Sequence, residues 1–252
     1  MGKQDHAFPI KGRVGKLTFY KTPLGHMVRE ARGVSADKLL NDPKFEITRQ
    51  NMAEFGRAGK ASKLIRDTLR PVIGPIKDGR MISRLSSVLM QAVKLDAIND
   101  PGLRNLVDGD LQILNGFEFN AGSFLASSLI APFGSATDRV TGKISVDIAS
   151  FIPKQMVVAP KGATHFQINL AGADLDFPAL TGIASYSDTG LLPVNDLATA
   201  AIHLEVMLPA ASVNPLITLL GIEFYQVALN GKVQKMSNGT FNSLAIVAID
   251  KL

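Results

Sequence analysis

Apolar residues change their spacing once along this chain, and the change restricts the folds that are possible. Within residues 78–99 they recur three and four positions apart, which is typical of one face of a helix: Met81, Ile82, Leu85, Val88, Leu89, Ala92 and Val93. From residue 111 onward they alternate with polar residues, as in Ile144–Ile148, Phe166–Leu170 and Ile202–Leu208. That alternation is the pattern of half-buried strands. A helical region followed by a strand-rich region predicts an α+β protein.

Residues 103–252 are expected to form one β domain. Its short alternating segments are separated by turn signals, among them Asn230–Gly231 and Asn238–Gly239. A closing apolar strand is expected at Leu244–Ile249. This succession predicts an antiparallel β-sandwich of immunoglobulin-like type.

Residues 35–102 are expected to form a basic helical hairpin. Asp42 followed by Pro43 is a helix start signal, and proline and glycine in residues 71–75 end the first helix. Two helices joined by a short turn are expected to pack antiparallel. The apolar contacts at the start of the first helix are expected from Phe45, Met52 and Phe55.

Residues 1–34 are expected to form a β-arm. Lys16–Lys21 and His26–Arg29 contain residue types that suit strands, and Thr22–Gly25 supplies a turn between them. An isolated two-stranded hairpin is only marginally stable in water. The arm must therefore pack against its own helices, the C-terminal domain or another subunit.

Charge is distributed unevenly along the chain. Residues 1–100 carry 19 Lys and Arg against 10 Asp and Glu, whereas residues 101–252 carry 8 against 12. The basic side of the predicted helices contains Arg57, Lys60, Lys63, Arg66 and Arg70. Such a surface can bind nucleic acid or the acidic half of a neighbouring copy, or it can be a solvated face without a partner.

No pattern in the chain predicts a catalytic, cofactor or metal site. The absence of cysteine excludes disulfides, thiolate catalysis and cysteine-bound metals. The pairs Asp108/Asp110 and Asp174/Asp176 offer oxygen ligands of the kind that Ca²⁺ prefers, but solvated turn or strand positions account for them more simply. No two of the four histidines lie at metal-ligand spacing: His6, His26, His165 and His203.

Two short segments imitate catalytic motifs. Gly56–Ser62 resembles a phosphate-binding loop, but it has two residues instead of four between its glycines, and Ala follows Lys60. We expect this segment to lie inside a helix. Ser35–Lys38 has the spacing of acyl-serine enzymes without their companion motifs, so Ser35 is expected to cap a helix.

The sequence contains no run of about 18 apolar residues, so no transmembrane helix is expected. Residues 1–9 are polar and lack the apolar centre of a secretory signal. We therefore expect a cytoplasmic protein, or one released without a classical signal peptide.

Three blocks of the sequence carry a resemblance: Gly15–Thr22 (GKLTFYKT), Glu54–Ala61 (EFGRAGKA) and Gly221–Gln226 (GIEFYQ). Together they resemble a family of uncharacterised proteins common in Bacteroidota genomes, and the resemblance spans nearly the whole chain. The N-terminal arm also resembles short phage-like proteins of the same bacteria. The resemblance implies no known enzyme activity and no catalytic residues.

These observations predict a non-enzymatic structural subunit that assembles with other copies of itself into a filament, tube or phage-like particle. The arm is expected to form the subunit contact, with Phe19 and Tyr20 as anchors and with Lys16, Lys21 and Arg29 attracted to the acidic half of a neighbour. Alternatively, the arm folds back onto its own sandwich. A second possible function is nucleic-acid binding by the basic face of residues 57–94, and a third is an enzyme of unidentified class. No cofactor or small-molecule substrate is expected.

Overall fold

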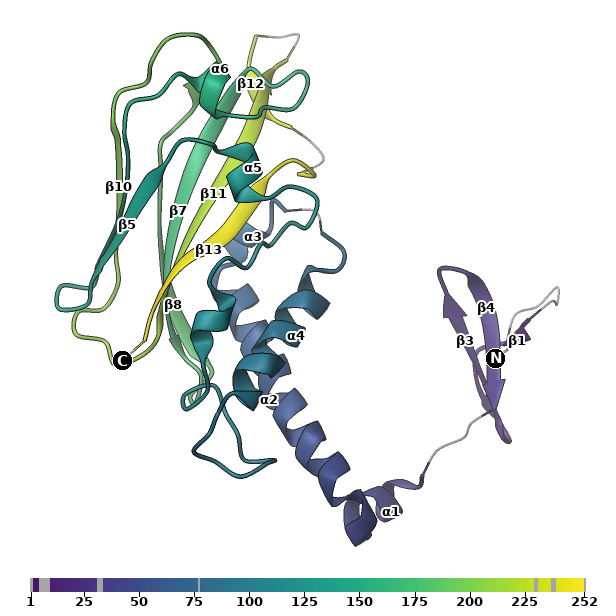
Figure 1. Cartoon of the computed structure of the whole chain (residues 1–252). Coiled ribbons are helices and arrows are strands. Elements are labelled where there is room, and N and C mark those ends of the chain that lie inside the picture. The colour runs from purple at the N-terminus through teal and green to yellow at the C-terminus, as the bar shows by residue number, and fades with distance from the viewer. Residues whose placement is uncertain are drawn as a thin grey trace. The chain divides into compact units, whose positions relative to one another are not determined.

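The computed structural model describes residues 2–4, 10–30, 34–76, 78–228, 231–236 and 239–251, which form an α+β protein (Figure 1). The chain divides into two compact units, Met1–Gln50 and Asn51–Leu252. Neither boundary expected from the sequence, 34/35 or 102/103, coincides with this division. No helix in the described ranges is both long enough and apolar enough to span a bilayer.

The first unit begins with a four-stranded antiparallel sheet in the order β1-β4-β3-β2. Its strands are Gly2–Lys3 (β1), Gly12–Val14 (β2), Leu17–Thr22 (β3) and Gly25–Glu30 (β4). The predicted strand pair is present as β3 and β4, and two shorter strands widen it. A short helix, α1 (Ala36–Asn41), and a 3-10 turn, η1 (Pro43–Phe45), follow. The side chain of Ser35 accepts a hydrogen bond from the Lys38 N–H at 3.3 Å, which confirms its predicted role as a helix cap.

Three helices come next in the chain: α2 (Glu46–Thr68), α3 (Arg70–Ile73) and α4 (Met81–Lys94). Gly56–Ser62 lies inside α2, as predicted. The predicted apolar contacts of Met52 and Phe55 are wrong, because these side chains are 54% and 61% exposed. Met52 lies on the side of α2 opposite its buried residues, which include Ala58, Ala61 and Ile65, whereas Phe55 lies at the flank of that buried side.

The strands of the second unit form two antiparallel sheets. The small sheet has the order β10-β6-β5, from Ile202–Met207, Lys143–Ile148 and Phe133–Asp138. At the centre of the large sheet, β11 (Leu216–Val227) pairs with β7 (His165–Asp176) on one side. On the other side it pairs with β13 (Ser243–Asp250) and β12 (Val233–Lys235), while β8 (Thr181–Asp188) and β9 (Leu192–Pro193) pair with β7. Three short elements lie between strands: η2 (Leu111–Leu114), α5 (Leu125–Ser128) and α6 (Pro153–Met156).

The large sheet is covered on both faces. Ile168 and Leu170 of β7 pack with the small sheet. Ala171 and Ala173 of the same strand point to the opposite face and pack with α2 and α4. The second unit therefore has three layers, with helices, large sheet and small sheet in that order (Figure 1). The predicted alternation is confirmed, since all three apolar residues of Ile144–Ile148 are buried. The predicted helices share a hydrophobic core with the large sheet.

Candidate functional site

The N-terminal sheet presents one apolar face. Neighbouring residues of a strand point to opposite faces, and the register pairs Val14 with Leu17 and Phe19 with Val28. These four side chains therefore share one side of the sheet, which we call the apolar face. Val14 and Leu17 are 60% and 44% exposed, and Phe19 and Val28 are half-buried. Within the described part of residues 2–50, no side chain is buried.

The opposite face of this sheet is polar and basic. The guanidinium carbon of Arg29 lies 5.4 Å from the centroid of the Tyr20 ring, within the range of a cation–π contact. Arg13 is on the same face, because it pairs with Thr18, which also pairs with Arg29. The predicted anchors Phe19 and Tyr20 thus lie on opposite faces.

The two predicted lysines of this contact lie at different places in the sheet. Lys16 is exposed in the turn before β3, whereas Lys21 is exposed near the end of β3, on the same side of the sheet as Leu17 and Phe19. The structure therefore does not gather Lys16, Phe19, Tyr20, Lys21 and Arg29 on one surface.

The predicted basic residues wind around α2 because they follow one another in steps of three, and a helix has about 3.6 residues per turn. Lys60 and Lys63 are exposed, whereas Arg57 and Arg66 are half-buried at the sides. One nitrogen of Arg57 donates hydrogen bonds to the carbonyls of Gly102 and Arg104 at 2.7 and 2.9 Å. Arg70 lies outside α2 and forms a long, exposed ion pair of 3.7 Å with Asp67.

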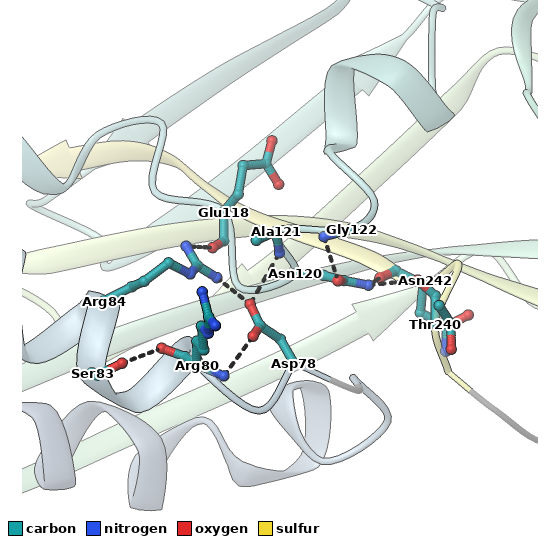
Figure 2. Close-up of polar contacts among 10 residues, drawn as sticks. All are labelled: Asp78, Arg80, Ser83, Arg84, Glu118, Asn120, Ala121, Gly122, Thr240 and Asn242. Carbon is teal, nitrogen blue, oxygen red and sulfur yellow. Dashed lines mark hydrogen bonds and ion pairs between the residues drawn. The ribbon is translucent and has the colours of Figure 1, made fainter.

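A polar cluster joins α4 to one edge of the large sheet (Figure 2). Residues 116–119 extend this edge, since the N–H groups of Gly116 and Phe119 donate to carbonyls of β13, both at 2.8 Å. Arg84 on α4 donates a hydrogen bond of 2.8 Å to the carbonyl of Glu118 in this segment. The guanidinium also lies over the ring of Phe117, 5.1 Å from its centroid. Arg84 thereby satisfies a backbone group at a sheet edge.

Asp78 completes this cluster. Its carboxylate accepts hydrogen bonds from Arg84 at 2.6 Å, from the Arg80 N–H at 2.7 Å and from the Ala121 N–H at 3.1 Å. Burial opposes ionisation of Asp78, but the two N–H groups and the guanidinium outweigh it and lower its pKa to about 2. The ion pair with Arg84 connects the loop before α4 to α4 itself, and the hydrogen bond from the Ala121 N–H connects this loop to the segment that follows the edge.

The Glu118 carboxyl group is the most perturbed acid in this region. Figure 2 shows it pointing away from the Arg84 guanidinium. One oxygen accepts from the Leu125 N–H at 3.0 Å, while the other is shielded from solvent without a hydrogen-bond partner among the described residues. Burial raises the pKa of Glu118 to about 7, against the effects of the Leu125 N–H and the Arg84 charge. This carboxyl can therefore exchange a proton near neutral pH.

Sequence reasoning did not identify Asp78, Arg84 or Glu118 as a group. They lie in three separate segments, and none belongs to a motif with a recognisable spacing. The proton affinity of Glu118 arises from its contact with the start of α5 and from burial at the sheet edge, neither of which leaves a signal in the local sequence.

Both acidic pairs contain an aspartate that accepts hydrogen bonds from asparagine side chains. Asp108 accepts from the side-chain amides of Asn99 and Asn105 at 2.7 and 2.8 Å, and Asp174 accepts from that of Asn214 at 2.8 Å. In the part of the chain that the structure describes, no group of three or more His, Asp or Glu side chains is arranged to hold a metal ion. His6 lies outside the described residues.

His203 joins an exposed charge network on the small sheet. Its Nδ1 lies 2.6 Å from Asp147, which the register places opposite it, and its Nε2 lies 3.3 Å from Glu205. The hydrogen bond with Asp147, followed by that with Glu205, raises the pKa of His203. Lys143 forms an ion pair of 2.5 Å with the same Glu205. Exposed pairs of this kind contribute little to stability.

The resemblance to Bacteroidota proteins rests on the three sequence blocks alone and stays a prediction. No family model, curated protein or solved structure matches this chain.

Proposed function

We propose that this chain is a non-enzymatic structural subunit that self-assembles into a homo-oligomer through its N-terminal sheet. The observation that supports this proposal best is the apolar face of Val14, Leu17, Phe19 and Val28, two of which are 60% and 44% exposed. Burying apolar surface is favourable by about 25 cal/mol per Å². A small sheet gains independent stability only when one face is packed, so a second copy that covers this face stabilises the sheet.

The distribution of charge favours a contact between unlike surfaces. Residues 1–50 carry 10 Lys and Arg against 5 Asp and Glu, whereas residues 101–252 carry 8 against 12. Two N-terminal sheets placed face to face bring like net charges together, while a sheet docked on the second half of the next copy meets the opposite charge. A contact between unlike surfaces repeats from copy to copy and generates a ring, tube or filament.

The test compares two full-length variants that add the same charge to neighbouring positions of β3. Leu17→Asp places a carboxylate on the apolar face, and Thr18→Asp places one on the opposite face. We expect the wild-type chain and Thr18→Asp to form large particles in light scattering and negative-stain microscopy, and Leu17→Asp to remain monomeric. Particle size is expected to fall as salt screens the charges.

Three results would contradict the proposal. A wild-type chain that stays monomeric at high concentration excludes self-assembly. Equal particle sizes for Leu17→Asp and the wild type exclude the apolar face as the contact. Assembly that survives deletion of residues 1–34 excludes the whole arm, and it supports the alternative in which the arm packs on its own chain.

The alternative function, nucleic-acid binding along α2, is favoured by the exposed Lys60 and Lys63. Phosphate contacts make affinity fall steeply with salt. A gel shift at two salt concentrations with Lys60→Gln/Lys63→Gln separates this function from assembly, because the double variant is expected to assemble normally while losing any salt-sensitive shift.

The immunoglobulin-like type of the two packed sheets also stays a prediction, as does the absence of enzyme activity.

A further inference from the structure

A pocket of about 300 Å³ lies in the second unit, where α2 meets the loop of residues 105–107 and the turn between β7 and β8. Its interior is apolar, with Ala61, Leu106 and Phe177 as buried walls. This volume is at the lower end of the range of about 300–1,000 Å³ for small-molecule sites. The pocket therefore suits the apolar body of one small molecule.

Two exposed apolar residues form the rim, Val107 at 45% and Leu180 at 44% exposure. Leu180 has a φ of 57°, a conformation that bulky residues rarely adopt. Asp176 accepts a hydrogen bond from the Ala179 N–H at 2.8 Å in the same turn, and Asn105 accepts one from the Val107 N–H at 2.8 Å. Side-chain hydrogen bonds thus hold both sides of the rim in place before a ligand binds.

The two charged residues among those that line the pocket are both basic. Lys60 and Arg57 both line the pocket, and neither takes part in the ion pairs found in the described ranges. The guanidinium of Arg57 donates hydrogen bonds to two backbone carbonyls, which hold it in place. Glu54, three residues before Arg57, is buried, and its carboxylate accepts a hydrogen bond from the Gly102 N–H. Glu54 does not line the pocket. An apolar interior therefore lies beneath a cationic opening.

We propose that this pocket binds a small amphipathic carboxylate, with its apolar body against Phe177 and Leu106 and its carboxylate at Lys60. The apolar walls supply affinity through burial, and the lysine orients the ligand and selects its charge. A flexible, exposed lysine suits an anion that remains partly in water, because its ammonium group is a strongly hydrated point charge. This inference does not rest on the proposed assembly.

The test is isothermal titration of the full-length protein with octanoate, kept below the concentrations at which it forms micelles. Octanol lacks the charge, and acetate lacks the apolar body. We expect saturable binding of octanoate with one site per chain, weaker binding of octanol and no detectable binding of acetate. Lys60→Gln is expected to weaken octanoate binding by up to about fivefold, the range of a partly exposed ion pair.

Two matched controls make the result specific to this pocket. Lys63→Gln removes the same charge from the same helix without touching the lining, and it is expected to leave octanoate binding unchanged. Val107→Asp places a negative charge on the rim and is expected to abolish binding, whereas Val140→Asp, at a site 78% exposed outside the lining, leaves it intact. Equal binding of octanol and octanoate, equal effects of Lys60→Gln and Lys63→Gln, or no saturable octanoate binding would each overturn the proposal.

Discussion

The two larger sheets of this protein follow the same local rules and reach opposite degrees of burial. In the N-terminal sheet, β3 and β4 form a hairpin whose side chains point alternately to its two faces, and no described residue of the sheet is buried. In the large sheet, β7 and β8 also form a hairpin, yet the adjoining strand β11 is buried without interruption from Leu216 to Phe224. Helices cover one of its faces and a second sheet covers the other. Burial is therefore decided by the layers around a sheet and not by strand pairing.

The edges of the two sheets differ in the same way. Residues 116–119 extend the edge of the large sheet, and Arg84 and Asp78 bind the backbone of this segment and of the residues after it. In the N-terminal sheet the outer strands are β1 and β2, which contain two and three residues. Very short outer strands are one way in which proteins limit edge-to-edge pairing, so the apolar face is the stronger candidate for an intermolecular contact.

The comparison is tested most severely by truncating one leucine in each sheet. Leu220 is fully buried in β11, and Leu220→Ala is expected to lower the free energy of unfolding of the second unit by about 2–5 kcal/mol. Leu17→Ala in the N-terminal sheet is expected to leave that transition unchanged. Urea unfolding followed by circular dichroism measures both. Comparable losses would mean that the two sheets are equally covered.

A smaller effect is expected where a glycine permits close packing. A Cβ at Gly221 in β11 would lie 2.8 Å from the carbonyl oxygen of Ser243, whereas one at Gly134 in β5 would meet nothing within 4 Å. We expect Gly221→Ala to cost about 1–3 kcal/mol of unfolding free energy and Gly134→Ala to cost nothing measurable. Thermal unfolding of the two variants measures this difference, with a larger drop in melting temperature expected for Gly221→Ala. Similar melting temperatures for the two variants would contradict the prediction.

The capped edge gives a third comparison, between two aspartates that contact arginine. Asp78→Asn removes a shielded charge that accepts hydrogen bonds from three donors. It is expected to lower the free energy of unfolding by about 1–3 kcal/mol. Asp67→Asn breaks an exposed pair and is expected to change stability by less than about 0.5 kcal/mol.

The effect of Asp78 depends on pH in a defined direction. Its pKa is lowered from 3.8 to about 2 in the folded protein, so the folded state favours the ionised form. The stabilisation is complete above pH 3.8 and disappears as the pH falls toward 2. Urea midpoints for the wild type and Asp78→Asn should therefore converge in acid, and a constant difference would contradict the role given to the charge.

The smallest expected effect is at Glu118, whose pKa is raised from 4.5 to about 7. The folded state then binds more protons than the unfolded state between these values, so the contribution of Glu118 to stability declines as the pH rises through this interval. Glu118→Gln stays neutral and is expected to remove this decline. Urea midpoints from about pH 5 to pH 8 measure the slope, and parallel curves for the two proteins would show that the carboxyl is ionised throughout.

Strands and helices with a strong local pattern could be predicted from the sequence. The alternating residues of β6, β7 and β10 are buried on the predicted side, and the predicted closing strand Leu244–Ile249 lies within β13. The predicted helix over residues 78–99 ends earlier, at Lys94, because Asp96 accepts the N–H groups of Ile98, Asn99 and Asn105 and begins a loop.

Coverage of the large sheet on both faces was not predicted, although one signal for it is present. Leu216–Ile222 is nearly continuous in apolar residues, and such runs are typical of strands buried on both faces. Alternation alone reveals one buried face per strand. The candidate sites left no comparable signal, since the pocket at Lys60 is formed by three segments and the cluster at Glu118 by residues from α4, the sheet edge and α5.

The sequence by itself determined the local elements: the hairpin in residues 17–30, the caps at Ser35 and Asp42, and the change from helical to alternating spacing. These depend on neighbouring residues, whose steric preferences and hydrogen bonds act over a few positions. Only the tertiary structure decided that α2 and α4 cover the large sheet and that the N-terminal sheet keeps an exposed apolar face. It also set the proton affinities of Asp78 and Glu118. Burial and pKa depend on groups brought together from distant parts of the chain, and local sequence patterns do not encode which groups these are.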